Sequence, residues 1–137
     1  LSPLSADRAA LAAALASMDS QEGTRIDLGL SAADEALAAG DRAQAKPVVI
    51  LLTDGLQNNP QRPGNEDVLT AAAGLKGRGA LIYSIGLGQE IDADLLRAVA
   101  SSPERYYPSP TAEQLAEIYR QITEQLPCDL RGAIGGG

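Results

Sequence analysis

The fold of this chain is constrained most by one short apolar run that ends in an acidic residue. Residues 47–52 read PVVILL and continue directly into Thr53, Asp54 and Gly55. Apolar and polar residues do not alternate along this run, and several of its residues are β-branched. Such a run is typical of a strand in a parallel sheet whose two faces are both covered by helices. We therefore expect a buried strand over residues 48–52 with a carboxylate at its end.

Helices and two further strands are predicted around this strand. The periodic patterns predict strands over 80–85 and 105–107, and helices that begin near Ser5, Ile26, Asn65, Asp92 and Thr111. Leu11, Leu15 and Met18 should form one apolar stripe on the first helix. Gly40 should close the second helix as a left-handed C-cap. Thr111 and Gln114 have the spacing of a capping box for the last helix.

The order of these elements predicts an α/β fold. Strands that alternate with helices are typical of an open, mostly parallel, Rossmann-like (doubly wound) sheet with flanking helices. The strand over 48–52 can pair directly only with 80–85, and 105–107 would lie beyond that. One edge of the most hydrophobic strand is then unpaired, which favours aggregation. We expect a fold truncated at its N-terminal half and self-association through this exposed edge.

Composition and charge exclude several classes of partner and site. The formal net charge is −7, and the basic residues are scattered singly, so we expect no nucleic-acid partner. No run approaches the roughly 18 apolar residues of a membrane-spanning helix. Cys128 is the only cysteine, which rules out an internal disulfide and a cysteine-based zinc site. Residues 127–137 are predicted to be a flexible tail after a domain over 1–126.

Asp54 is a candidate ligand-binding residue because of its position. Open α/β sheets bind ligands beyond the carboxyl ends of their strands, and Asp54 occupies such an end. A simple turn explains Asp54 and Gly55 equally well, since both residues favour turns. Thr24 places a hydroxyl on a loop that follows Gly23 and opens a predicted helix.

Three motifs in order carry a resemblance to a known family. They are GTRIDLGL at 23–30, LLTDG at 51–55 and IYSIGLG at 82–88. Together they resemble the von Willebrand factor type A (vWA) domain, and the resemblance extends from about Leu1 to Leu126. It implies a doubly wound sheet with a metal-ion-dependent adhesion site (MIDAS) at its carboxyl edge.

The resemblance also implies specific metal ligands. That site uses an Asp-x-Ser-x-Ser motif on the first strand, a loop threonine and an aspartate that ends the fourth strand. By similarity, Thr24 is the threonine and Asp54 is the aspartate. Asp-x-Ser-x-Ser has no match here, because the Asp19-Ser20 pair follows a helix and lacks the second serine.

The resemblance implies a protein-interaction or adhesion module rather than an enzyme. The complete domain would use Mg²⁺, or Mn²⁺ or Ca²⁺, and its protein ligand would offer an acidic side chain to the ion. Mg²⁺ requires about six oxygens, so two ligands should hold it weakly or not at all. Surface and secreted relatives favour an extracytoplasmic or cell-surface location, although intracellular members exist. The alanine-rich composition is typical of a bacterial protein.

Residues near the candidate ligands are open to plainer interpretations. Asp27 lies near Thr24 in the sequence and could face the same edge, but it is expected to be an ordinary first-turn acid that the helix dipole favours. Gln57, Asn58 and Asn59 are expected to form a solvated turn, although they could also border a binding surface.

Three other function classes are an enzyme, a nucleotide-binding domain and a structural module. The chain has no histidine, which excludes Ser-His-Asp and Cys-His catalysis. A phosphoacceptor or phosphatase-type role for Asp54 would use an Asp-x-Asp pair, and here Leu56 occupies the position of the second acid. Gly86 and Gly88 resemble half of a dinucleotide fingerprint, but Ile91 replaces the third glycine. A structural vWA-like module that binds no metal stays open.

Overall fold

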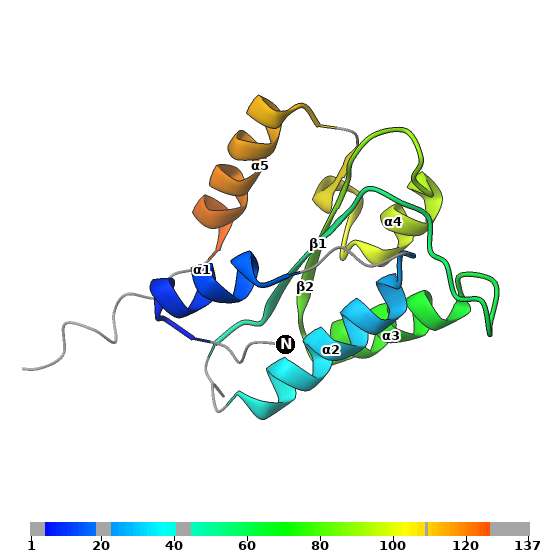
Figure 1. The fold of residues 1–137 in the computed structure, drawn as a ribbon, viewed down its shortest axis with the longest axis horizontal. Helices are drawn as coiled ribbons and strands as arrows, with labels where there is room; N and C mark the ends of the chain where they lie inside the picture. The colour runs from blue at the N-terminus through cyan, green and yellow to red at the C-terminus, as the bar shows by residue number, and fades with distance from the viewer. Residues whose placement is uncertain (1–4, 19–22, 41–44, 109, 127–137) are drawn as a thin grey trace, which may run out of the picture.

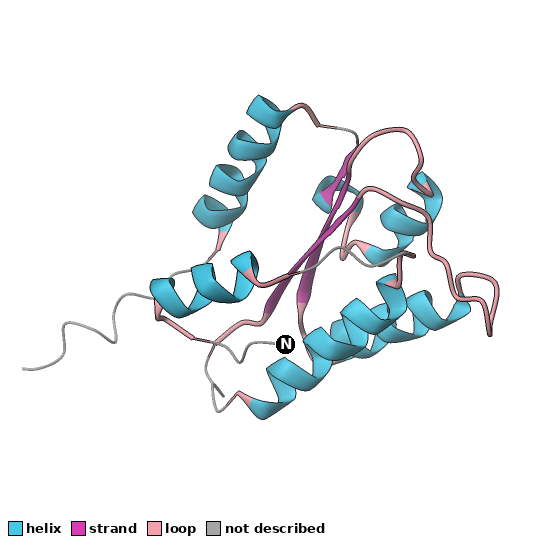
Figure 2. Cartoon of the chain, viewed as in Figure 1, coloured by secondary structure: helices cyan, strands magenta, loops and turns pink. Residues whose placement is uncertain are grey.

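The computed structural model describes residues 5–18, 23–40, 45–108 and 110–126 (Figures 1 and 2). Within these ranges the helices are α1 (Arg8–Ala16), α2 (Ile26–Ala39), α3 (Glu66–Gly77), α4 (Ala93–Val99) and α5 (Ala112–Gln125). The strands are β1 (Val48–Thr53), β2 (Leu81–Gly86) and β3 (Tyr106–Pro108), and a 3₁₀ turn over Pro103–Arg105 precedes β3. Asp19, Ser20, Cys128 and the predicted tail lie outside the described residues.

The three strands form one open parallel sheet in the order β1-β2-β3. The register pairs Val48 with Leu81 and continues to Thr53 with Gly86. The predicted α/β class, strand order and strand direction are therefore confirmed. Within the described part of the chain, nothing pairs with the other edge of β1.

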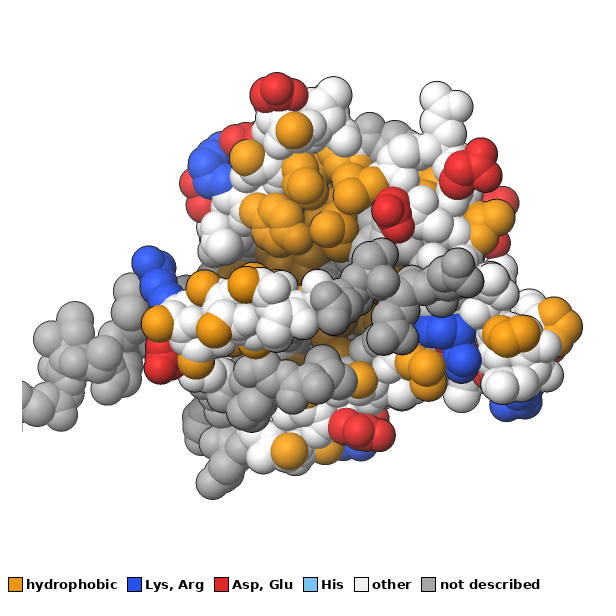
Figure 3. Space-filling view, in the orientation of Figure 1, with side chains coloured by type: hydrophobic (Ala, Val, Ile, Leu, Met, Phe, Trp, Pro, Cys, Tyr) orange, Lys and Arg blue, Asp and Glu red, His pale blue; other side chains and the backbone are white. Residues whose placement is uncertain are grey.

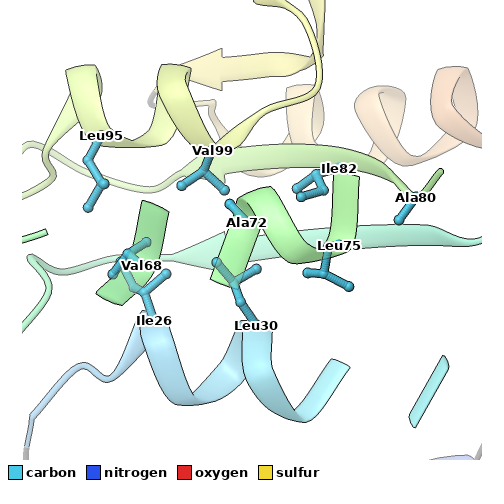
Figure 4. Close-up of a cluster of buried hydrophobic side chains, with 9 residues drawn as sticks. All are labelled: Ile26, Leu30, Val68, Ala72, Leu75, Ala80, Ile82, Leu95 and Val99. Atoms are coloured by element: carbon cyan, nitrogen blue, oxygen red, sulfur yellow. The ribbon is translucent and has the colours of Figure 1, made fainter. Parts of the chain in front are cut away.

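Helices cover the two faces of the sheet. On one face, α2, α3 and α4 pack around β2, and Figure 4 shows their side chains meeting there. The buried residues of this cluster are Ile26, Leu30, Val68, Ala72, Leu75, Ala80, Ile82, Leu95 and Val99. On the other face, Ile118 and Ile122 of α5 pack against Tyr83 and Ile85 of β2. The sheet is thus fixed from both sides at β2, its central strand.

The prediction that β1 is buried on both faces was wrong. Only Thr53 of this strand is buried, whereas Ile50 is 37% and Leu52 is 42% exposed. The register places these two beside Tyr83 and Ile85, on the face that α5 covers. They stay open because α5 packs on β2 and no strand of the described ranges pairs with the outer edge of β1. Figure 3 shows a hydrophobic surface between α5 and α1.

The predicted stripe of α1 is also not buried. Leu11, Leu15 and Met18 are 36%, 69% and 73% exposed, and no residue of α1 is buried. The N-cap is Asp7, whose carboxylate accepts hydrogen bonds from the amides of Ala9 and Ala10, rather than Ser5. An apolar stripe shows that a helix has a face that favours burial, but it does not show which element, if any, packs against that face.

The other helix ends lie at the predicted residues, but not every cap has the predicted geometry. Asp92 caps α4, and Thr111 with Gln114 forms the predicted capping box of α5. Asn65 is the N-cap of α3, but its side chain donates to Asp92 Oδ2 at 2.8 Å instead of capping. Gly40 ends α2 with an extended backbone (φ −78°, ψ 116°), so the expected left-handed cap was wrong. Glycine permits the left-handed conformation without requiring it.

Candidate metal centre

The carboxyl end of β1 presents an acidic side chain to solvent. Thr53 is buried, and its hydroxyl donates to the Gly55 carbonyl at 3.2 Å and accepts from the Gly55 amide at 3.3 Å. The Thr53 carbonyl accepts from the amide of Leu87 at 2.8 Å, which ties this end to the loop after β2. Asp54 is exposed and makes no hydrogen bond or ion pair with any residue of the described ranges. Its carboxylate is therefore available to a ligand.

Thr24 lies directly against the residue that follows Asp54. A Cβ atom added to Gly55 would be 2.7 Å from Thr24 Oγ1. Gly55 does not have a left-handed backbone, so the glycine is required here for space rather than for conformation. The amide of Asn58 donates to the Thr24 carbonyl at 2.7 Å. The structure thus brings the loops of Thr24 and Asp54 together at one edge of the sheet (Figure 1).

A glutamine from the Asp54 loop caps the helix that follows Thr24. Gln57 Oε1 accepts hydrogen bonds from the amides of Ile26 at 2.7 Å and Asp27 at 3.3 Å. Gln57 Nε2 donates to Asp27 Oδ1 at 2.7 Å. Arg25 is the N-cap of α2 by position, and its own side chain makes no capping bond. The cap comes instead from a residue about thirty positions away.

Asp27 is a buried, fully partnered acid. Its side chain is 8% exposed, and Arg25 Nε and Nη2 donate to its two oxygens at 2.9 and 2.7 Å. The Arg25 guanidinium, helped by Gln57 and against the opposing effect of burial, holds the pKa of Asp27 well below its usual range. Asp27 does lie in the first turn of α2, as expected, but its burial and its pairing with Arg25 were not part of that expectation.

The residues after Asp54 do not form a simple solvated turn. Asn59 is 7% exposed, and its Oδ1 accepts from the amides of Gln61 and Arg62 at 3.1 and 3.3 Å. Of the three residues in question, only Asn58 has an exposed side chain. Asn-Pro sequences favour turns in which the asparagine side chain accepts hydrogen bonds from backbone amides a few residues later. This dipeptide was the sequence feature that could have indicated the role of Asn59.

The glycines after β2 are explained by packing. A Cβ on Gly86 would be 2.5 Å from Ile91 Cδ1 and 2.9 Å from Leu96 Cδ1. Gly88 has a φ of +76°, which favours glycine. Side chains thus occupy the space beside Gly86 that close backbone contact with a phosphate would need. The local structure is a strand-to-helix turn.

The donors at this edge suit a divalent cation in kind but fall short in number. A hydroxyl and a free carboxylate are hard oxygen ligands of the type that Mg²⁺ prefers, and Mg²⁺ requires near-octahedral coordination. Across the described ranges, no three His, Cys, Asp or Glu side chains are grouped so that they could hold a metal ion. The edge therefore fits part of a metal site.

Comparisons with known proteins were made by sequence and by structure. The family model described as the von Willebrand factor type A domain matches residues 2–121. A search of curated proteins found no match to the chain. Within the described ranges, no helix has the length and apolar character needed to cross a membrane.

Several solved structures share this fold. Proximal thread matrix protein 1 from the mussel byssus, with a zinc-occupied MIDAS motif, is 27% identical with a TM-score of 0.69. The pilus adhesin SpaC from Lactobacillus rhamnosus GG is 21% identical with a TM-score of 0.68. Manganese-loaded Plasmodium vivax TRAP protein is 24% identical with a TM-score of 0.58. The two latter likenesses show the fold alone.

The matches span most of this chain and a smaller part of each neighbour. They cover 86% of this chain and 28% of the mussel protein's chain. The corresponding shares are 84% and 20% for the pilus adhesin, and 80% and 44% for the Plasmodium protein. The chain therefore spans less than half the length of each of these neighbours.

Proposed function

This chain belongs to the von Willebrand factor type A domain family, and we propose that it is a protein-interaction or adhesion module that binds a divalent cation at the carboxyl edge of its sheet. The observation that carries this proposal is the contact of Thr24 with Gly55, beside an Asp54 that has no partner among the described residues. A role in binding, rather than catalysis, fits a chain without histidine.

Thr24 and Asp54 would hold the ion through a hydroxyl and a carboxylate oxygen. We infer Mg²⁺ as the physiological cation, with Mn²⁺ or Ca²⁺ as substitutes, because both donors are hard oxygens. The zinc-occupied motif of the mussel protein supports the use of a divalent cation at this edge. When bound, the ion supplies positive charge that attracts an acidic side chain of a protein ligand.

Further donors would have to come from outside the described residues. A parallel strand at the free edge of β1 would end beside Asp54, because the carboxyl ends of parallel strands meet at one edge of a sheet. Such a strand is where the missing Asp-x-Ser-x-Ser element would contribute. We expect the chain alone to bind Mg²⁺ weakly or not at all.

The test is a calorimetric titration of the chain with Mn²⁺ and Mg²⁺, repeated with Asp54→Asn. We expect Mn²⁺ binding at millimolar concentrations that Asp54→Asn abolishes, and micromolar Mg²⁺ affinity would contradict an incomplete site. A short peptide with a central glutamate should strengthen Mn²⁺ binding, and the same peptide with glutamine should not. Equal effects of the two peptides would contradict recognition of an acidic ligand.

Self-association through the edge of β1 is a second candidate interaction. Its support is the free strand edge together with the exposed Ile50 and Leu52. Antiparallel pairing of two β1 strands would continue the sheet and place these side chains beside their copies. We also infer an extracytoplasmic or cell-surface location from the mussel byssus neighbour, and a bacterial source from the alanine-rich composition.

A further inference from the structure

Three contacts join the Thr24 loop to the Asp54 loop. Thr24 Oγ1 lies against Gly55, and the Thr24 carbonyl accepts from the amide of Asn58 at 2.7 Å. Between these two points, Gln57 Oε1 accepts from the first amides of α2. These three contacts hold the two loops together.

Gln57 occupies the centre of this junction. Its Oε1 bonds fix it to the N-terminus of α2, two residues after Thr24, and it is itself three residues after Asp54. Its Nε2 donates to Asp27 Oδ1 at 2.7 Å, which fixes the orientation of the amide group. Arg25 holds that carboxylate in turn through both of its oxygens. The glutamine thus has one well-defined position.

We propose that Gln57 is a positioning residue that holds the Thr24 hydroxyl beside the Asp54 loop. The Thr24 hydroxyl and the Asp54 carboxylate can then bind the same cation. The effect of Gln57 on cation binding rests on the proposed function, whereas its role in holding the two loops together does not. Gln57 acts through its bonds to α2, and its polar atoms are both engaged there.

A capping role alone would have a narrower effect. A cap stabilises the amides that donate hydrogen bonds to it, and here these are the amides of Ile26 and Asp27. A positioning role also extends to Thr24, which precedes the helix, and to its contacts with Gly55 and Asn58. The two roles are separated by whether these contacts persist without the glutamine.

The experiment uses the full chain with Gln57→Ala, measured by nuclear magnetic resonance. The matched control is Gln61→Ala, because Gln61 is exposed on the same loop and its side chain makes no hydrogen bond to any residue that the structure describes. We expect Gln57→Ala to remove the nuclear Overhauser contact between the Thr24 side chain and the Gly55 α-protons. Hydrogen exchange of the Asn58 amide should become at least about tenfold faster, since its bond to Thr24 opens locally. Should the alanine variant fail to fold, Gln57→Met removes the polar atoms and keeps the side-chain length.

A Mn²⁺ titration on the same samples separates this proposal from the proposed function. In folded Gln57→Ala, the Mn²⁺ affinity read from line broadening at Thr24 and Gly55 should fall about tenfold or more. An unchanged affinity, or an intact Thr24–Gly55 contact, would overturn the positioning role. If the unsubstituted chain shows no broadening there, the metal site fails, and the contact and exchange data alone decide whether Gln57 positions the loops.

Discussion

Adding one methyl group at Gly55 tests the close approach of Thr24 directly. In Gly55→Ala, the new Cβ would lie 2.7 Å from Thr24 Oγ1, below the 3.0 Å that real Cβ contacts reach. Overpacking of this kind costs about 1–3 kcal/mol, and an alanine in place of glycine returns about 0.4–1 kcal/mol through the unfolded state. We expect the free energy of unfolding to fall by about 1–2 kcal/mol.

A double-mutant cycle shows whether Thr24 causes this cost. Thr24→Ala removes the clashing oxygen, so Gly55→Ala in that background should be neutral or slightly stabilising. Thr24→Val is the matched control, since it keeps a group in the place of the hydroxyl and should retain the cost. Urea unfolding followed by circular dichroism gives each free energy. A coupling energy below about 0.3 kcal/mol would refute the contact.

Three further results are expected. Ser84→Ala should lower the free energy of unfolding by about 1 kcal/mol, because this buried hydroxyl donates to the Leu96 carbonyl at 2.7 Å; an unchanged urea midpoint would contradict this. Asp27→Asn should destabilise most at neutral pH, because a lowered pKa gives stability that is complete above about pH 4 and lost as the pH falls; an equal deficit at pH 7 and pH 2.5 would exclude that cause. Ile50→Lys should reduce self-association in light scattering while the chain stays folded, and an unsubstituted chain that is monomeric at high concentration would count against the β1 edge.

The sequence predicted the elements whose signals are local. The apolar run before Asp54, the capping box at Thr111 and the cap at Asp92 each lie within a few residues of the structure that they specify. Strand pairing followed from the number of strands available, and the sheet has the expected order. Local patterns and simple topology therefore sufficed for the fold class.

The surroundings of the candidate site depend on contacts that a local pattern does not contain. Gln57 caps α2 from about thirty residues away, so neither its own neighbours nor those of Asp27 indicate the bond. The burial of Asp27 follows from that bond and from Arg25. Because non-local partners decide such burial, the sequence indicated neither the burial of Asp27 nor the capping of α2 by Gln57.

The exposure of β1 and α1 has a related cause. Ile50 and Leu52 were expected to be buried, and Leu15 belongs to an apolar stripe, because apolar side chains favour burial. Burial also requires a neighbouring element, and nothing in the described ranges covers these positions. Periodicity identifies which face of an element is apolar, and only the packed structure shows whether another element covers that face.

The central claim is that Thr24 and Asp54 present their oxygens to one cation at the edge of the sheet. The most direct measurement is a map of Mn²⁺ line broadening over the amides of the full chain, with Thr24→Ala and Asp54→Asn alongside. We predict broadening centred on residue 24 and residues 54–55, which either substitution strongly reduces. Broadening centred on other acidic residues, or unchanged by Asp54→Asn, would contradict the claim.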